Sequence, residues 1–145
     1  MLFRSRSALY AVRSQGLPAA GVWRDNHAAR LEQAYSLVRD LASLPRPLVL
    51  AGDFNAMDAS PVMEIVRASG LRDAFASAGF GWGFTYGHMG RRFGAFLRID
   101  HVLASRDIGI AAARVGGDDA SPHRPVIADL LLRRVAAPTP ASGPQ

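Results

Sequence analysis

The sequence predicts an α/β fold of the α+β sandwich type, and three observations support this. The chain has 145 residues, 49% of them hydrophobic, which is enough to bury a core of its own. Helix-like and strand-like segments alternate in the first part of the chain. Strand-like segments dominate the later part, and no internal repeat is visible. Helices packed against a sheet are the arrangement that this order favours.

The first helix is predicted after an irregular start. Residues 1–24 have neither helical nor alternating spacing, and Gly16, Pro18 and Gly21 interrupt them. Asp25 or Asn26 can cap a helix that runs to about Ser43. Its apolar positions recur at helical spacing, and we expect this helix to cover one face of a sheet: Leu31, Ala34, Tyr35, Val38, Leu41 and Ala42. The domain that begins with this helix is expected to span residues 25–134.

A buried strand and two short helical segments come next. The apolar run at 47–51 is short and bounded by turn residues, as in a buried strand. Ser60 followed by Pro61 predicts the start of a helix over 60–69, which Gly70 ends. A second helical turn is expected over 71–78.

The later part of the chain is predicted to be mostly strands. The stretch "GFGWGFTYGHMGRRFG" alternates glycine with aromatic and basic residues, so we expect an irregular surface loop outside the core, with a strand piece at 84–86. Strands are predicted near 97–104, 109–115 and 125–132. The composition of residues 135–145 is typical of a disordered tail.

Composition excludes several classes of function. The sequence has no cysteine, which removes disulfides, thiolate metal sites and cysteine nucleophiles. No apolar run is long enough for a membrane span or a convincing signal peptide, so a cytoplasmic protein is the default expectation. The net charge of +5 is compatible with nucleic acid. The basic residues are all arginines and mostly scattered, so this charge is no argument for a phosphate-binding face.

Polar residues gather at the ends of three strand-like segments. Asp53 and Asn55 follow the first strand, Asp100 and His101 lie in "RIDHVLAS", and His123 precedes the last strand. Each alone is compatible with turn chemistry. Together they are residues that can activate water and hold a divalent cation. Carboxylate and amide oxygens favour Mg²⁺ or Mn²⁺, and two histidines without further ligands are poor for structural zinc.

Six motifs in order resemble the endonuclease/exonuclease/phosphatase superfamily of metal-dependent phosphoesterases. They are "GDFN", "SP", "GLRDAF", "TY", "RIDHV" and "SPHRPV", between Gly52 and Val126. The resemblance implies the C-terminal half of the four-layered DNase I-like fold. It also implies a Mg²⁺- or Mn²⁺-dependent phosphoesterase. The implied substrate is a phosphate ester, with DNA or RNA ahead of phosphoinositides and small phosphomonoesters.

The resemblance also implies roles for individual residues. Asp53 would orient or deprotonate the attacking water, and Asn55 would hydrogen-bond the phosphate or that water. Both would lie at the metal. Asp100 would pair with His123, which would donate a proton to a phosphate oxygen. His101 is expected to be a packed strand residue, and His27 and His88 loop or solvent residues.

Two departures from the family pattern bear on activity. Pro122 stands where the family has a metal-site aspartate, and Asp118 and Asp119 are the nearest carboxylates upstream. The family's glutamate metal ligand comes from an N-terminal half, and neither Glu32 nor Glu64 is expected to replace it.

We therefore expect a truncated domain of reduced activity, whose partners include a missing N-terminal half or a second copy. The alternative hypothesis is a non-catalytic remnant that acts as a protein-interaction module. Arg91 and Arg92 either grip phosphates or form a solvated pair, and the second interpretation is favoured.

Overall fold

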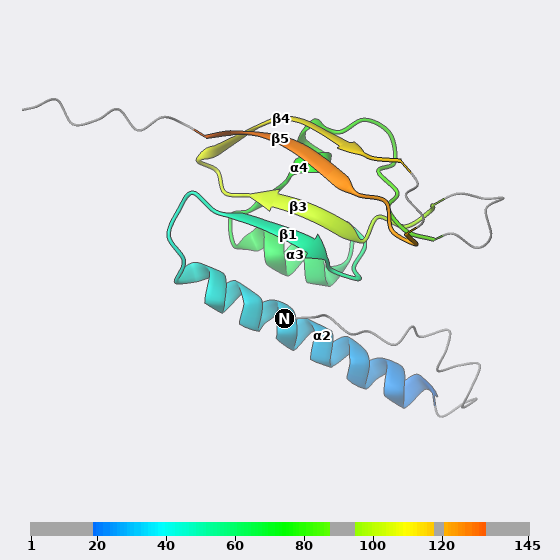
Figure 1. Cartoon of the computed structure of the whole chain (residues 1–145). Coiled ribbons are helices and arrows are strands. Elements are labelled where there is room, and N and C mark those ends of the chain that lie inside the picture. The colour runs from blue at the N-terminus through cyan, green and yellow to red at the C-terminus, as the bar shows by residue number, and fades with distance from the viewer. Residues whose placement is uncertain (1–18, 88–94, 118–120, 133–145) are drawn as a thin grey trace, which may run out of the picture.

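The structure is a computed structural model that describes residues 19–87, 95–117 and 121–132 (Figure 1). Several predictions concern residues outside these ranges. They are the irregular segment before Ala19, the tail after residue 134, His88, Arg91, Arg92, Asp118 and Asp119.

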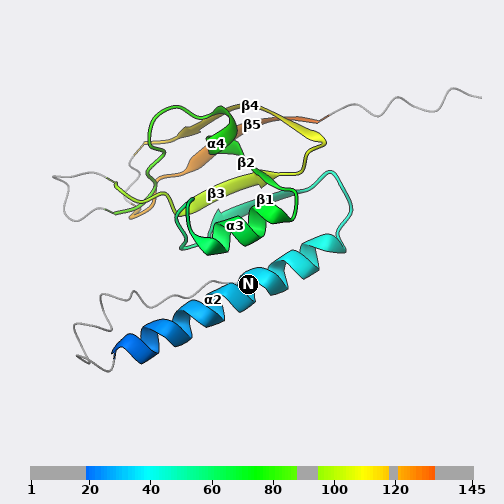
Figure 2. The same ribbon diagram turned by 180° about the vertical axis from the view of Figure 1, so that it is seen from behind.

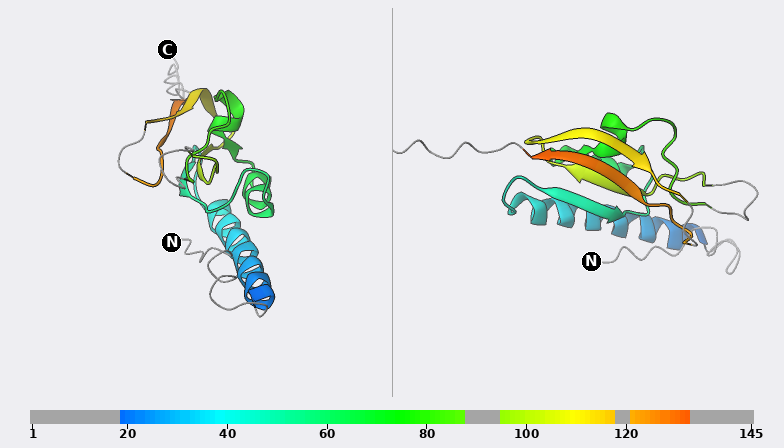
Figure 3. Two further views of the ribbon diagram at one scale, coloured as in Figure 1. Left: turned by 90° about the vertical axis from the view of Figure 1, so that its right-hand side faces the viewer. Right: turned by 45° about the horizontal axis from the view of Figure 1, so that its top comes forward.

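Five strands form the sheet structure of the described residues. β1 (Val49–Asp53) and β2 (Arg72–Asp73) pair antiparallel with the two sides of β3 (Asp100–Ala104). β4 (Ile108–Val115) and β5 (Val126–Leu132) form an antiparallel pair. β5 lies beside β3, so the two sheets continue one another as a single layer (Figures 1 and 3). This mixed fold with antiparallel sheets confirms the predicted class.

The helices gather on one side of this strand layer. α3 (Pro61–Ala68) and α4 (Ala74–Ala78) lie behind the strands in Figure 1 and in front of them in Figure 2. α2 (Ala19–Ala42) packs mainly against α3. Among the described residues, no helix covers the opposite face of β1, β3 and β5, which we call the open face.

The main core lies between α2, α3 and the β1–β3 pair. Ser60 caps α3 by accepting a hydrogen bond from the backbone N–H of Met63 at 3.4 Å, and Pro61 occupies the first turn, as predicted. The inner side of α3 is fully buried in this core: Val62, Met63 and Val66. A smaller core, built around Phe75, Ala74 and Ala113, joins α4 to β4.

The structure corrects the prediction for the first helix. α2 begins at Ala19, six residues before the expected cap at Asp25. A cap residue stabilises a helix by only about 1 kcal/mol. The alanines before Asp25 have a high helix propensity, which outweighs the low propensity of Gly21. Tyr35 is 51% exposed, and the buried face of the helix is centred on Ala34 and Leu41. This face meets α3, so α2 does not cover the sheet directly.

The segment after α4 also differs from its prediction. It is irregular, but it is not confined to the surface, because Thr85 is fully buried. Gly83 adopts a φ of 66°, and a Cβ there would lie 2.4 Å from Phe75. Glycine therefore lets the backbone pass close to the core. The helical turn expected over 71–78 is present from Ala74 onward as α4, whereas Arg72 and Asp73 form β2, and Asp73 also caps the helix.

Candidate active site

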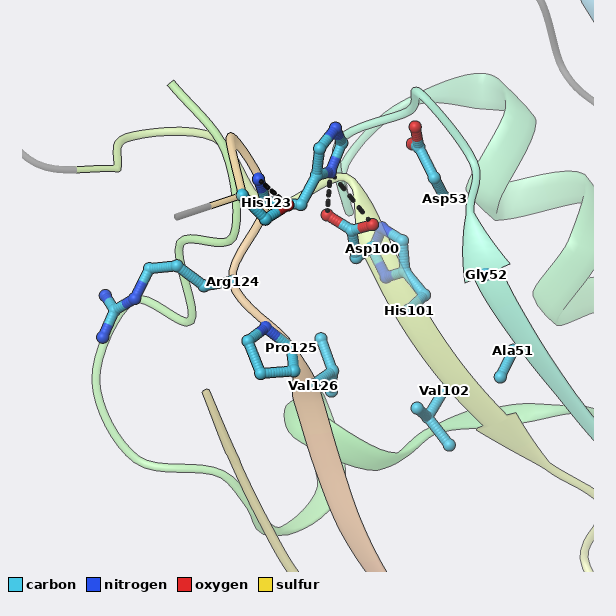
Figure 4. A pocket seen from close by; sticks show the side chains of 11 residues that line it. Ala51, Gly52, Asp53, Asp100, His101, Val102, His123, Arg124, Pro125 and Val126 are labelled. Carbon is cyan, nitrogen blue, oxygen red and sulfur yellow. Dashed lines mark hydrogen bonds and ion pairs between the residues drawn. The ribbon is translucent and has the colours of Figure 1, made fainter. Parts of the chain in front are cut away.

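Strand pairing brings two of the predicted site residues together. In the antiparallel register of β1 and β3, Asp53 lies opposite Asp100. His123 lies just before β5, which runs beside β3. One ligating atom from each of Asp53, Asp100 and His123 lies within 4.8 Å of the other two. The three clusters predicted from separate strand ends therefore meet at one end of the sheet (Figure 4).

Asp100 and His123 form a hydrogen-bonded pair. Nδ1 of His123 lies 2.9 Å from Oδ2 and 3.2 Å from Oδ1 of Asp100. The ring of Tyr86 packs against the imidazole with a centroid separation of 4.6 Å. The backbone N–H of His123 donates to Oγ of Ser121 at 3.1 Å, which closes a turn over Pro122. Pro122 thus leaves His123 in contact with Asp100.

The turn after β1 is held from two sides. The carboxylate of Asp53 accepts from the backbone N–H of Asn55 at 2.7 Å and from its Nδ2 at 3.0 Å. Asn55 has a φ of 47°, a left-handed conformation that asparagine tolerates. Arg30 of α2 donates to the carbonyl oxygens of Phe54 and Asn55. Burial lowers the pKa of Arg30, and the negative charge of Asp53 opposes this shift.

Thr85 supports both members of the Asp100–His123 pair. Its hydroxyl accepts from the backbone N–H groups of Ile99 at 3.2 Å and Asp100 at 3.3 Å. Its carbonyl oxygen accepts from the N–H of Arg124, the residue after His123, at 2.7 Å. Sequence analysis missed both Thr85 and Arg30 as supports of the site. Thr85 belongs to the "TY" motif, but its contacts, like those of Arg30, are with distant segments that this motif does not indicate.

A second cluster lies behind the site, on the helix side of β3. His101 is 1% exposed, which confirms its prediction as a packed residue. Its Nδ1 lies 2.7 Å from Oδ2 of Asp73, and its Nε2 lies 2.9 Å from the carbonyl oxygen of Ala56. His101 therefore links the start of α4 to the chain that follows the Asp53–Asn55 turn.

Arg98 neutralises the carboxylates of this second cluster. It contacts Asp58 at 2.6 Å and Asp73 at 2.9 Å, and Asp58 also pairs with Arg67 at 2.8 Å. Asp58, Asp73 and His101 are close enough together to suggest a metal site. Because a guanidinium already occupies the position of a cation, we interpret the cluster as a structural ion-pair network.

A recess of about 480 Å³ opens beside Asp53, Asp100 and His123 (Figure 4). Its other walls belong to the open face and include Ala51, Val102 and Val126. The polar groups thus stand at one end of a mostly apolar hollow.

Two glutamates and one histidine lie outside this site. Glu32 is exposed on α2, where it pairs with Arg39 at 3.5 Å. Glu64 is exposed in the first turn of α3. His27 is half-buried on α2. None of them joins either group of candidate metal ligands among the described residues.

Comparison with known proteins identifies the family. The sequence profile of the Endonuclease/Exonuclease/phosphatase family matches residues 7–123. The chain belongs to this family. Its members act on phosphate esters and generally depend on divalent metals. No curated protein sequence matches the chain significantly.

Solved structures share the fold. An endonuclease/exonuclease/phosphatase from Bacteroides vulgatus matches with a TM-score of 0.63 and 27% identity over 73% of this chain and 45% of its own. A family protein from Bacteroides thetaiotaomicron matches with a TM-score of 0.62 and 22% identity, over 74% and 46%. A mannosyl-6-phosphatase from the same organism matches with a TM-score of 0.59 and 22% identity, over 72% and 46%. The chain thus spans less than half the length of these proteins.

The described helices also bear on membrane association. Within the described ranges, none of them is both long and apolar enough to span a bilayer.

Proposed function

We propose that the site hydrolyses phosphodiester bonds of nucleic acid with the help of Mg²⁺ or Mn²⁺. The observation that carries this proposal is the meeting of Asp53, Asp100 and His123 at one end of the recess. Membership of a family that acts on phosphate esters supports the reaction class. The role of each residue, the metal and the substrate are our inference.

His123 is proposed to act as the proton donor. Asp100 engages Nδ1 of His123, so Nε2 is the ring nitrogen left to face a phosphate oxygen. A proton donated from Nε2 would stabilise the negative charge that this oxygen gains in the transition state. Removing one such donor typically costs about 2.7–4 kcal/mol of barrier.

Asp53 and Asn55 are proposed to hold the attacking water and the metal. The hydrogen bonds from Asn55 occupy two of the roughly four acceptor positions of the Asp53 carboxylate. The remaining positions are open to water or a cation, since Asp53 is exposed. These oxygen donors fit Mg²⁺, which keeps several waters and needs few protein ligands. When bound, the cation would neutralise phosphate charge and make the water more acidic.

Mg²⁺-dependent nicking of supercoiled plasmid tests this function. We expect nicking in Mg²⁺, none in EDTA, and loss of activity in His123→Ala. His27→Ala is the matched control and should retain activity, because His27 lies on α2 outside the site. Nicking that persists in His123→Ala would show that another site or a contaminant is responsible.

A second candidate function is an interaction module, and the open face favours it. Val49 of β1 is 44% exposed, and Ala51 beside it is also exposed. Solved relatives contain about twice the matched length, so we infer that this chain corresponds to the C-terminal half of their fold. In this hypothesis the open face binds a complementary half or a second copy.

The mass of the protein in solution tests whether it acts as an interaction module. Sedimentation should reveal self-association that Val49→Glu weakens, because the substitution places a charge on the open face. A chain that remains monomeric, unfolds cooperatively and binds no apolar dye would contradict it.

A further inference from the structure

A row of aromatic side chains leads toward His123. Trp82, Phe84 and Tyr86 alternate with Gly83 and Thr85. The rings of Trp82 and Phe84 are stacked, with centroids 5.8 Å apart and planes inclined by 10°. Tyr86, at the end of the row, packs against the imidazole of His123. The aromatic segment therefore reaches the edge of the candidate active site.

Hydrogen bonds and close packing hold the backbone of this segment in place, although the side chain of Trp82 is exposed. The N–H groups of Thr85 and Tyr86 both donate to the carbonyl oxygen of Leu97, at 2.7 and 2.9 Å. Gly83 lies directly against Phe75. The side chain of Trp82 is nevertheless 81% exposed. A large apolar ring that is displayed to solvent on a fixed backbone indicates a binding surface.

A second cavity lies beside these rings. It has a volume of about 280 Å³, and its walls include Phe80, Trp82, Phe84, Val115 and Arg124. Arg124 also lines the recess of the active site. Its Nε donates to the carbonyl oxygen of Gly116 at 3.0 Å, which anchors the guanidinium. Arg124 thus borders both hollows, and its guanidinium points away from Asp100 and His123 (Figure 4).

The side chains that line this cavity favour a nucleobase over a sugar as the bound group. No carboxylate or carboxamide side chain is among the described residues that line this cavity. Recognition of a sugar by its hydroxyl groups would leave most of those groups without side-chain partners. A flat nucleobase instead gains stacking energy from an indole face, and its phosphate is attracted by arginine.

We propose that Trp82, Phe84 and Arg124 form a nucleobase subsite next to the scissile phosphate. The inference rests on the proposed function and assigns its substrate class as single-stranded or locally unpaired nucleic acid. Stacking holds the base of one nucleotide on Trp82, and Arg124, the residue after His123, borders both this subsite and the recess.

Binding in EDTA tests the subsite without hydrolysis. The probes are a fluorescently labelled oligothymidylate and an abasic oligomer of equal length and charge, followed by anisotropy. We expect the oligothymidylate to bind about tenfold more tightly than the abasic oligomer. Trp82→Ala should remove this preference, whereas Trp82→Phe should retain part of it. Tyr35→Ala, which removes an exposed aromatic ring on α2, is the matched control and should leave both affinities unchanged.

Several outcomes would overturn the subsite. Equal binding of the two oligomers, or an unchanged preference in Trp82→Ala, would show that Trp82 binds no base. Competition by mannose 6-phosphate as strong as that by thymidine monophosphate would show a site for sugar phosphates. A base preference that depends on Trp82 would support the subsite even if plasmid nicking failed, so the two proposals can fail separately.

Discussion

Asp73 shows how one buried carboxylate joins several segments. It accepts hydrogen bonds from the N–H of Ala76 at 2.8 Å, from Arg98 at 2.9 Å and from His101 at 2.7 Å. Burial by itself raises the pKa of Asp73. The hydrogen bonds from His101 and Ala76 and the charge of Arg98 outweigh burial, and the pKa lies below its ordinary value. The ionised form is therefore the one that the fold stabilises.

This lowered pKa predicts acid sensitivity with a definite sign. A carboxyl group with a depressed folded pKa contributes stability above its unfolded pKa of about 3.9, and the contribution is lost as the pH falls through the folded value. We expect Asp73→Asn to lower the free energy of unfolding by about 3–5 kcal/mol at neutral pH, since it breaks a buried ion pair. The difference from the wild type should shrink below about pH 4. Urea unfolding at neutral pH and below about pH 4 measures the difference in unfolding free energy between the two proteins. A difference that stays constant would contradict the lowered pKa of Asp73.

The local sequence could predict some of the residues that form or support the candidate site, and not others. Asp53, Asp100 and His123 stand out because each lies beside a strand-like run and belongs to a short motif. Arg30 lies in none of these motifs, and although Thr85 lies in "TY", both residues bond backbone groups of distant segments, which local spacing cannot indicate. Asp73 could be recognised as part of "GLRDAF", but its ion pairs depend on how β2 and β3 align.

At the scale of elements, strands and the α3 helix were predictable because their signals are local. The Ser60–Pro61 start of α3 is a cap whose geometry the structure confirms. The predicted start of α2 was wrong because residues with high helix propensity can extend a helix on the N-terminal side of a possible cap residue. The interior position of Thr85 was missed because glycines at positive φ bring an irregular segment against Phe75.

The arrangement of the elements determines the site more than any one of them does. The β1–β3 register joins residues about fifty positions apart and places Asp53 opposite Asp100. A shift of one residue would move one of these carboxylates to the other face of the sheet. Thr85 then connects β3 to the segment that carries His123. Pairing between distant strands therefore builds the site, and periodicity in the sequence cannot reveal it.

At the scale of the whole molecule, the described part of the chain presents the candidate catalytic groups at the edge of the open face. The recess beside Asp53 is bounded by Ala51, Val102 and Val126 on that face. Solved relatives extend over more than twice the matched length. We infer that material packed on the open face would both bury these apolar groups and complete the ligand set around a metal.

The central claim is that Asp100 and His123 act as one catalytic unit, and a double-mutant cycle tests it most directly. Initial rates of Mg²⁺-dependent oligonucleotide hydrolysis are compared for the wild type, Asp100→Asn, His123→Ala and the double variant. Because Asp100 acts through His123, we expect His123→Ala to lower the rate by about 10²–10³-fold and the double variant to lose no more. Losses that multiply in the double variant, or a rate unaffected by His123→Ala, would contradict the claim.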